Sequence, residues 1–250
     1  MRLHLLNLTI DIGNTLAKLS VIDNTNVLFS DSAPEINQVM LANLLTRYPS
    51  LQRAIWVSVR KEFPPSWLDF LRGRLSFVME LTSRTPLPVK ISYKTPETLG
   101  MDRVAAVCGA QRIYPGKNVL VIDAGTAITY EFLSRTGEYR GGNISPGISM
   151  RFRALHVFTN RLPLVEETYD FRPAGTSTQE AIASGVLRGT LAEVNEYVNT
   201  FYQENPDGIV ILTGGDAIFF GRNLKSTIFV NPNLIHVGLE AILEFNAEAH

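Results

Sequence analysis

The chain has 250 residues, a formal net charge of -1 and 45% apolar residues, enough for one large domain or two small ones. The near-neutral charge and the scattered Lys and Arg residues exclude an evident surface for polyanions. No apolar run reaches the ~18 residues of a membrane span, residues 3–8 lack a signal-peptide cleavage site, and the lone Cys108 excludes an internal disulfide. We therefore expect a cytoplasmic protein whose partners include neither nucleic acid nor a membrane.

In the first half of the chain, hydrophobic periodicity predicts a β-rich start followed by alternating helices and strands. The expected strands are 6–10, 18–21, 27–29, 54–59 and 77–81, and the expected helices are 34–48 and 65–75. This order is typical of an α/β fold.

The second half repeats this plan. The expected strands are 119–122, 128–133, 209–212 and 227–230, and the expected helices are 179–202 and 233–247. In the first of these helices, alternating steps of four and three residues create one apolar face, made of Leu187, Leu191, Val194, Val198 and Phe201. A boundary near residues 115–117 divides the chain into predicted domains 1–117 and 118–250.

A short motif occurs once in each half. Asp11 and Asp123 each follow an apolar run and precede a glycine turn, at Gly13 and Gly125, with a threonine close behind. Glycine lets backbone amides approach a ligand closely, and a carboxylate at a strand end can orient a hydrated Mg²⁺ ion. One copy alone would fit an ordinary hairpin turn. Two copies in matching context favour a nucleotide held between two similar halves, and so phosphoryl transfer.

These turns differ from other nucleotide-binding motifs. The chain has no G-x-x-x-x-G-K-[ST] P-loop, and no G-x-G-x-x-G follows the first strand. A third glycine turn, 213–216, follows the strand 209–212, and its paired glycines could pack flat against a purine or ribose. The alternative is a tight strand-to-helix turn.

The segment Gly100-Met101-Asp102-Arg103 opens a predicted helix. Because aspartate has an unperturbed pKa of ~3.9, Asp102 would be ionised at neutral pH and could act as a general base towards a hydroxyl group. Arg103 could hold an anionic group of the same substrate. The alternatives are an acidic residue favoured only by the helix dipole and an ordinary surface arginine.

A capping signal precedes the long helix of the second half. Ser177, with Glu180 three residues later, fits a capping box, so Thr178 would occupy the first helical position. Backbone amides at that position attract anions. The alternative is a cap with no further role.

In this order and over nearly the whole chain, the motifs resemble those of the type III pantothenate kinases, members of the superfamily of acetate and sugar kinases, heat-shock chaperones and actin. Residues 11–15 are similar to the family's first phosphate loop, 123–126 to its second, 100–103 to its G-x-D-R motif and 141–147 to a further family stretch. The resemblance implies an α/β fold of two similar actin-like (ribonuclease H-like) domains with a nucleotide cleft between them.

The resemblance also implies roles for individual residues. Asp102 is the implied catalytic base, and Asp123 helps to hold a monovalent metal ion. The implied ATP-binding residues are Asp11, Ile12, Gly13, Asn14, Thr15, Leu16, Ala17, Lys18 and Thr126. The implied pantothenate-binding residues are Tyr93, Gly100, Met101, Asp102, Arg103 and Thr178.

The implied activity is the ATP-dependent phosphorylation of pantothenate to 4'-phosphopantothenate, the first step of coenzyme A biosynthesis. The implied enzyme is a homodimer that uses ATP with Mg²⁺ and a potassium or ammonium ion. One alternative is another small-molecule kinase or a phosphatase of the superfamily, which the compact chain disfavours because such enzymes usually carry inserted elements. The other is a nucleotide-binding accessory protein, which Asp11, Asp102 and Asp123 together disfavour because binding alone requires no base.

Overall fold

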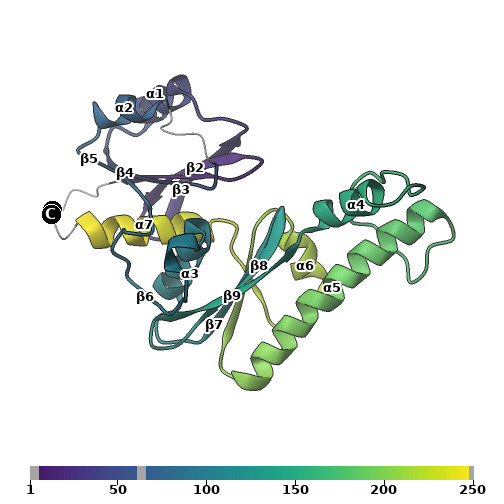
Figure 1. Ribbon diagram of the computed structural model, residues 1–250. Helices are drawn as coiled ribbons and strands as arrows, with labels where there is room; N and C mark the ends of the chain where they lie inside the picture. The colour runs from purple at the N-terminus through teal and green to yellow at the C-terminus, as the bar shows by residue number, and fades with distance from the viewer. Residues whose placement is uncertain (1–5, 61–65, 248–250) are drawn as a thin grey trace. The chain divides into compact units, whose positions relative to one another are not determined.

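The computed structural model describes residues 6–60 and 66–247, and its contacts divide the chain into two compact units (Figure 1). Unit 1 contains the chain up to Gly116, the segment Leu133–Arg140 and the chain from Asn233 onward. Unit 2 contains Lys117–Phe132 and Gly141–Pro232. These units assign 133–140 and the C-terminal helix to the first body. The division into two similar domains, 1–117 and 118–250, remains a prediction.

Unit 1 is built on a five-stranded sheet with the strand order β3-β2-β1-β4-β5. Its strands are β1 (Leu6–Ile12), β2 (Ala17–Asp23), β3 (Asn26–Ala33), β4 (Leu51–Ser58) and β5 (Phe77–Glu80). The three N-terminal strands pair antiparallel, whereas β1 pairs parallel to β4, and β4 parallel to β5. All five strands were predicted from the sequence. The continuous apolar run of β1 is explained by its central position, with both faces of the strand covered.

The helices of unit 1 are α1 (Gln38–Arg47), α2 (Leu68–Arg72), a 3₁₀ turn (Pro96–Thr98), α3 (Met101–Ile113) and α7 (Leu234–Ala247). In Figure 1, α1 and α2 cover one face of the five-stranded sheet and α7 covers the other. Helix α1 begins later than the predicted residue 34, because the Asn37 side chain accepts the Met40 amide at 3.0 Å and caps the helix. Helix α2 is also shorter than predicted; residue 65, its predicted start, lies outside the described residues.

Unit 2 contains most of the second sheet, whose strand order is β11-β10-β7-β8-β9-β6. The strands are β6 (Lys90–Ile91), which belongs to unit 1, and β7 (Val119–Ala124), β8 (Ala127–Leu133), β9 (Glu138–Pro146), β10 (Ile209–Thr213) and β11 (Phe229–Val230). Strands β7, β10 and β11 are parallel. Strand β11 is shorter than the predicted 227–230, and β6 was not predicted because two residues carry no periodicity.

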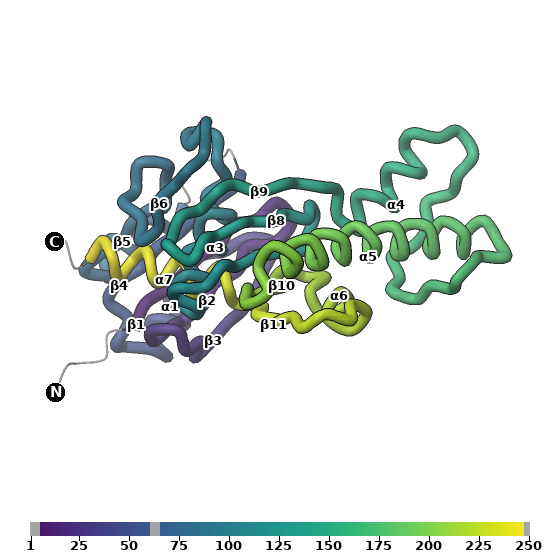
Figure 2. Tube along the Cα trace, turned by 90° about the horizontal axis from the view of Figure 1, so that it is seen from below, coloured from purple at the N-terminus to yellow at the C-terminus, as the bar shows by residue number. Residues whose placement is uncertain are grey.

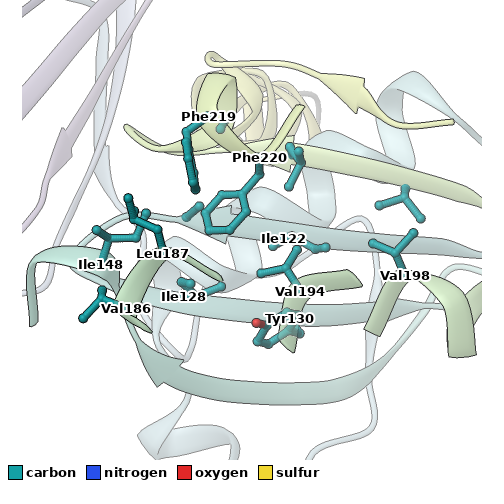
Figure 3. Packing of buried hydrophobic residues seen from close by; sticks show 14 of the residues in the cluster. Ile122, Ile128, Tyr130, Ile148, Val186, Leu187, Val194, Val198, Phe219 and Phe220 are labelled. Carbon is teal, nitrogen blue, oxygen red and sulfur yellow. The ribbon is translucent and has the colours of Figure 1, made fainter. Parts of the chain in front are cut away.

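The helices of unit 2 are α4 (Ile148–Val157), α5 (Thr178–Glu204) and α6 (Ala217–Asn223). The predicted apolar face of α5 is confirmed: Leu187, Val194 and Val198 pack on Ile122 and Ile128 of the sheet (Figure 3). Figure 2 shows α4 and the segment after it lying along the first half of α5. Helix α4 was not predicted; it is short, and of its apolar side chains only Ile148 and Phe152 are buried. None of the described helices is both long and apolar enough to span a bilayer.

Helices α3 and α7 cross at backbone distance within unit 1. A Cβ atom on Gly238 of α7 would lie 1.7 Å from the carbonyl oxygen of Ala105 in α3. No side chain fits there, so the helices can approach this closely only because residue 238 is glycine. This contact also explains how α7, the last helix of the chain, is held in unit 1.

We predict that Gly238→Ala destabilises the protein by about 3 kcal/mol or more, because the added methyl group forces the two helices apart. Thermal or urea unfolding would measure the loss. The matched control is Gly189→Ala in α5, where a Cβ would meet nothing within 4 Å. That variant should be neutral or gain up to ~1 kcal/mol from helix propensity. Equal stability of the two variants would contradict the packing argument.

A buried polar cluster joins α7 to β1. The Nδ1 atom of His236 lies 2.9 Å from the Thr9 hydroxyl oxygen, and the Asn7 amide donates to Glu240 at 3.3 Å. His236 and Glu240 are 2% and 1% exposed. Burial, with the nearby Glu244 charge, raises the pKa of Glu240 to about 7, and burial, with Lys18, lowers the pKa of His236 to about 3. The two groups therefore favour their neutral forms in the folded protein.

The raised pKa of Glu240 predicts that its contribution to stability is fully present below about pH 4.5 and is lost as the pH rises through about 7. The His236 contribution changes oppositely, since it is lost as the pH falls from about 6.5 towards 3. Glu240→Gln removes only the first effect. Its unfolding free energy relative to wild type should therefore rise by roughly 2 kcal/mol between about pH 5 and pH 8.

Urea unfolding at several pH values would measure this difference for Glu240→Gln. The control is Glu35→Gln, which changes an exposed carboxylate of the same unit and should follow wild type across the range. A Glu240→Gln variant that also follows wild type would show that Glu240 does not carry a proton in the folded state.

Candidate active site

The first predicted phosphate turn connects β1 to β2 in unit 1. The Gly13 amide donates to the Leu16 carbonyl at 3.0 Å, which closes the turn, and Asp11 pairs with Lys18 in the β-ladder. Asp11 is 7% exposed. The tip of the turn is open: Asn14, Thr15 and Leu16 are exposed, while Ala17 is buried and Ile12 and Lys18 are half-buried. The turn thus presents polar side chains and backbone to solvent beside a carboxylate at the strand end.

Arg60 is anchored to this turn, which sequence reasoning missed. Its Nε donates to the Gly13 carbonyl at 2.8 Å, and its guanidinium also donates to the Pro34 carbonyl at 3.2 Å. Arg60 comes shortly after β4, separated from it by Val59, and β4 runs parallel to β1, so the two strands end at the same sheet edge. The signal available in the sequence was an arginine shortly after a strand that would pair parallel to β1, the strand that carries Asp11. A positive charge here favours an anionic ligand at the turn.

At the start of α3, Gly100 and Asp102 form a tight arrangement. Asp102 lies in the first helical turn, and its Oδ1 accepts the Arg103 backbone amide at 2.9 Å. A Cβ on Gly100 would lie 2.6 Å from that Oδ1 atom. The glycine therefore leaves space for the carboxylate to lie against the start of the helix. Met101, the first residue of α3, is half-buried.

The structure brings Tyr93 next to Arg103. The guanidinium carbon of Arg103 lies 6.0 Å from the centroid of the Tyr93 ring, and Arg103 is 7% exposed. Tyr93 in turn stacks on Tyr139, with ring centroids 6.4 Å apart and planes 5° apart. Two of the predicted pantothenate-binding residues, ten positions apart in the sequence, thus lie together at the beginning of α3.

The second predicted phosphate turn connects β7 to β8 in unit 2. The Gly125 amide donates to the Ala127 carbonyl at 3.1 Å, so this turn is shorter than the first one. Asp123 is half-buried at the end of β7, and Thr126 is exposed at the tip. As in unit 1, a carboxylate stands at the strand end and a hydroxyl group at the exposed turn.

Two further glycines pack against this second turn. The Gly147 amide donates to the Thr126 carbonyl at 3.1 Å, and a Cβ on Gly147 would lie 2.1 Å from the Gly125 carbonyl oxygen. Gly214 has a φ of +90°, and a Cβ there would lie 2.4 Å from Oδ1 of Asp123. The third predicted glycine turn, 213–216, thus meets the second one around Asp123. Only glycine fits at either position.

Asp216 completes this group of loops. Its amide donates to the Ala124 carbonyl at 2.9 Å, and its carboxylate accepts the Tyr169 hydroxyl at 2.7 Å. Burial raises the pKa of Asp216, although the Tyr169 hydrogen bond opposes this. The same hydrogen bond is the largest of the effects that raise the pKa of Tyr169 to about 12. The hydrogen bond joins the glycine turn to the segment between α4 and α5.

The predicted cap of α5 is confirmed. The Ser177 side chain accepts the Glu180 amide at 3.2 Å, so Thr178 is the first helical residue. Thr178 lies at a groove of about 800 Å³ between α4 and α5. The other lining residues are Arg151, Ala154, Leu155, Phe158, Thr159, Leu162, Ala181, Ile182, Gly185 and Val186. The groove is therefore mostly apolar, and none of residues 123–126 lines it.

The described residues contain no cluster of three or more acidic, histidine or cysteine side chains suited to a metal ion. Magnesium in kinases usually binds through one or two carboxylates, water and the substrate phosphates. Asp11 and Asp123, each at a strand end beside a glycine turn, fit that oxygen chemistry. Asp123 also lies against the space that Gly214 keeps open.

Comparison with solved structures shows the fold. The chain is similar to the activator of 2-hydroxyisocaproyl-CoA dehydratase from Clostridium difficile with bound ADPNP (13% identical, TM-score 0.52, covering 98% of this chain and 97% of that one). It is also similar to a glucokinase from an Antarctic psychrotroph (12% identical, TM-score 0.52, covering 96% and 99%). The predicted α/β fold of the actin-like sugar kinases and ATPases is confirmed.

Comparison with known sequences shows the family. The family model for type III pantothenate kinase matches residues 7–200. The type III pantothenate kinase of Phocaeicola vulgatus is 44% identical over 242 residues, covering 96% of this chain and 99% of that protein. The enzyme of the same name from Bacteroides fragilis is 44% identical over 243 residues, covering 96% and 98%. The chain therefore belongs to the type III pantothenate kinase family.

Proposed function

We propose that this protein transfers the γ-phosphoryl group of ATP to pantothenate and forms 4'-phosphopantothenate, the first step of coenzyme A biosynthesis. The observation that carries this proposal is a family match over residues 7–200 that includes both glycine turns and the Asp102 segment. The likeness extends over nearly the full length of relatives that bear the name. With a lone, buried Cys108, the cytoplasm is the proposed location.

ATP binds through the two exposed glycine turns in this proposal. The turn of unit 1 contributes Asp11, Ile12, Gly13, Asn14, Thr15, Leu16, Ala17 and Lys18, and that of unit 2 contributes Thr126. Asp11 orients Mg²⁺, which when bound offsets charge on the phosphates. Asp123 helps to hold a potassium or ammonium ion. The close packing of Gly214 against the Asp123 carboxylate, and of Gly147 against the turn that follows it, supports this role.

Pantothenate binds at the start of α3 in this proposal. Asp102 accepts the proton of its primary hydroxyl group, and the oxygen attacks the γ-phosphorus in line. Arg103 pairs with the substrate carboxylate, and Tyr93, Gly100, Met101 and Thr178 contribute further contacts. The support is local geometry: Gly100 leaves space for the Asp102 carboxylate, and Tyr93 lies 6.0 Å from the Arg103 guanidinium.

We predict that wild type releases ADP only when pantothenate is added, and that Asp102→Asn lowers kcat by about 10²- to 10⁴-fold, as loss of a general base typically does. The amide keeps the size of the carboxylate but cannot take a proton. ATP affinity should stay within about twofold of wild type, because Asp102 is not an ATP ligand in this proposal. A coupled ADP assay and calorimetry with ATP would measure the two quantities.

The same assay separates the alternatives. Running it in potassium and in sodium tests the monovalent cation, and activity is expected only in potassium. Glu97→Gln, which changes an exposed carboxylate near the start of α3, is the control and should keep wild-type kcat. Equal kcat in Asp102→Asn and wild type would reject the base. ADP release with a sugar but not with pantothenate would reject the proposed substrate.

A homodimer is also part of this proposal, and the groove between α4 and α5 supports it. The groove has a volume of about 800 Å³ and a mostly apolar lining. Phe158 at its edge is 85% exposed, and neighbouring Val157 and Leu164 are 64% and 57% exposed. Exposed apolar side chains beside an apolar groove are typical of a protein interface. A second copy of the chain is the proposed occupant.

Phe158→Glu should shift the protein from dimer to monomer, because it places a charge in the apolar interface. Light scattering after size exclusion would measure the mass. Val39→Glu is the control, since Val39 of α1 is 69% exposed, belongs to unit 1 and does not line the groove; it should leave the mass unchanged. A dimer that survives Phe158→Glu, or a wild-type monomer, would reject this interface.

A further inference from the structure

One carboxylate in unit 2 gathers three hydrogen bonds from three elements. Glu193 lies in the middle of α5, and its Oε1 accepts the Tyr130 hydroxyl of β8 at 2.8 Å and the Ser145 hydroxyl of β9 at 2.5 Å. Its Oε2 accepts the Arg151 guanidinium of α4 at 2.5 Å. Glu193 therefore ties α5 to β8, β9 and α4 at one point.

The hydrogen-bond partners of Glu193 favour the charged form of its carboxylate. Burial alone would raise its pKa, but the hydrogen bonds from Ser145, Arg151 and Tyr130 outweigh burial and lower the pKa. Burial and the bond to Glu193 raise the pKa of Tyr130, so its hydroxyl remains a donor. The Glu193 and Arg151 side chains are 28% and 23% exposed. Such a partly buried, charge-assisted ion pair holds its geometry better than a surface pair.

The bonds of Arg151 continue this connection to the second phosphate turn. Its Nε donates to the Pro146 carbonyl at 2.8 Å, directly before Gly147. Gly147 then donates to the Thr126 carbonyl at 3.1 Å, and it lies too close to Gly125 to tolerate a Cβ. The position of Pro146 and Gly147 therefore determines where the backbone of the turn lies.

We propose that Glu193 is a positioning residue for the second phosphate turn, acting through Arg151 and Ser145 on the segment 145–147. This inference rests on the proposed function, in which Thr126 contacts ATP. The hydrogen bonds of Glu193 go to Tyr130, Ser145 and Arg151 and to no residue of either turn. Its effect is on ATP alone, because the segment that it holds packs against the ATP-binding turn. Displacing a binding group by about 1 Å can cost ~10²-fold in rate or affinity.

The test is Glu193→Gln, which keeps the side-chain shape but removes the charge that faces Arg151. We expect the KM for ATP to rise about 10-fold, the KM for pantothenate to stay within about twofold, and the melting temperature to fall by only a few degrees. Glu196→Gln is the matched control on the same helix. Glu196 is exposed and interacts with Thr200 one turn later, and its loss should leave both KM values unchanged.

Two further variants keep the proposal testable if Glu193→Gln folds poorly. Ser145→Ala and Tyr130→Phe each remove one donor and leave the ion pair with Arg151 intact, so each should raise the KM for ATP by about two- to fivefold. Equal ATP constants in all three variants and in Glu196→Gln would overturn the proposal. A parallel rise of both KM values would also overturn it, since that indicates a general structural role.

Direct calorimetric titration with ATP, without pantothenate, distinguishes this inference from the proposed function. A wild-type protein that binds ATP but does not phosphorylate pantothenate would reject the function. Weaker ATP binding in Glu193→Gln than in Glu196→Gln would still support the positioning role in that case. Equal ATP binding in an otherwise active pair of variants would reject only the positioning role.

Discussion

The contact of Gly147 and Gly214 with the turn after Asp123 is the constraint on which the candidate site of unit 2 depends. Each glycine approaches the turn so closely that a Cβ atom would overlap a carbonyl or carboxylate oxygen. Loops that pack backbone against backbone have little room to shift. A phosphate-binding turn held in this way can present its amides in a fixed arrangement before the nucleotide arrives, which is the condition for electrostatic preorganisation.

Close packing at glycine residues is also important in unit 1. Gly100 leaves room for the Asp102 carboxylate at the start of α3, and Gly238 lets α7 cross α3 at backbone distance. The second contact supports the first, because α3 carries the proposed base and is packed by α7. Helix α7 also brings His236 and Glu240 against β1, the strand that ends at Asp11. Stability and the candidate site therefore depend on the same few elements.

Hydrogen bonds from charged side chains add a second constraint on the two turns, beside the close packing at the glycines. Glu193 joins four elements of unit 2 through three donors, and the Arg151 bonds extend this hold to the segment beside Thr126. In unit 1, Arg60 holds the carbonyl of Gly13 in the first turn. In both units, a charged side chain from outside the motif donates to backbone in or beside a proposed phosphate turn: Arg60 to Gly13 in unit 1, and Arg151 to Pro146 in unit 2. The family motif thus contains the proposed ligand-binding residues of each turn, whereas these charged residues support the backbone around it.

The local features could be predicted from the amino-acid order alone: the strands flanking both Asp-x-Gly turns, the apolar face of α5, its Ser177 cap and the family. These depend on neighbours within a few residues, or on motifs that stand in one stretch of chain. The folded chain was needed to find that Gly214 packs against Asp123, that Arg60 bonds the first turn and that Glu193 bonds Ser145 and Arg151. Those contacts join residues that are tens of positions apart in the chain. Hydrophobic periodicity reports only on near neighbours, so it cannot predict where a distant stretch of backbone will pack so closely that only glycine fits.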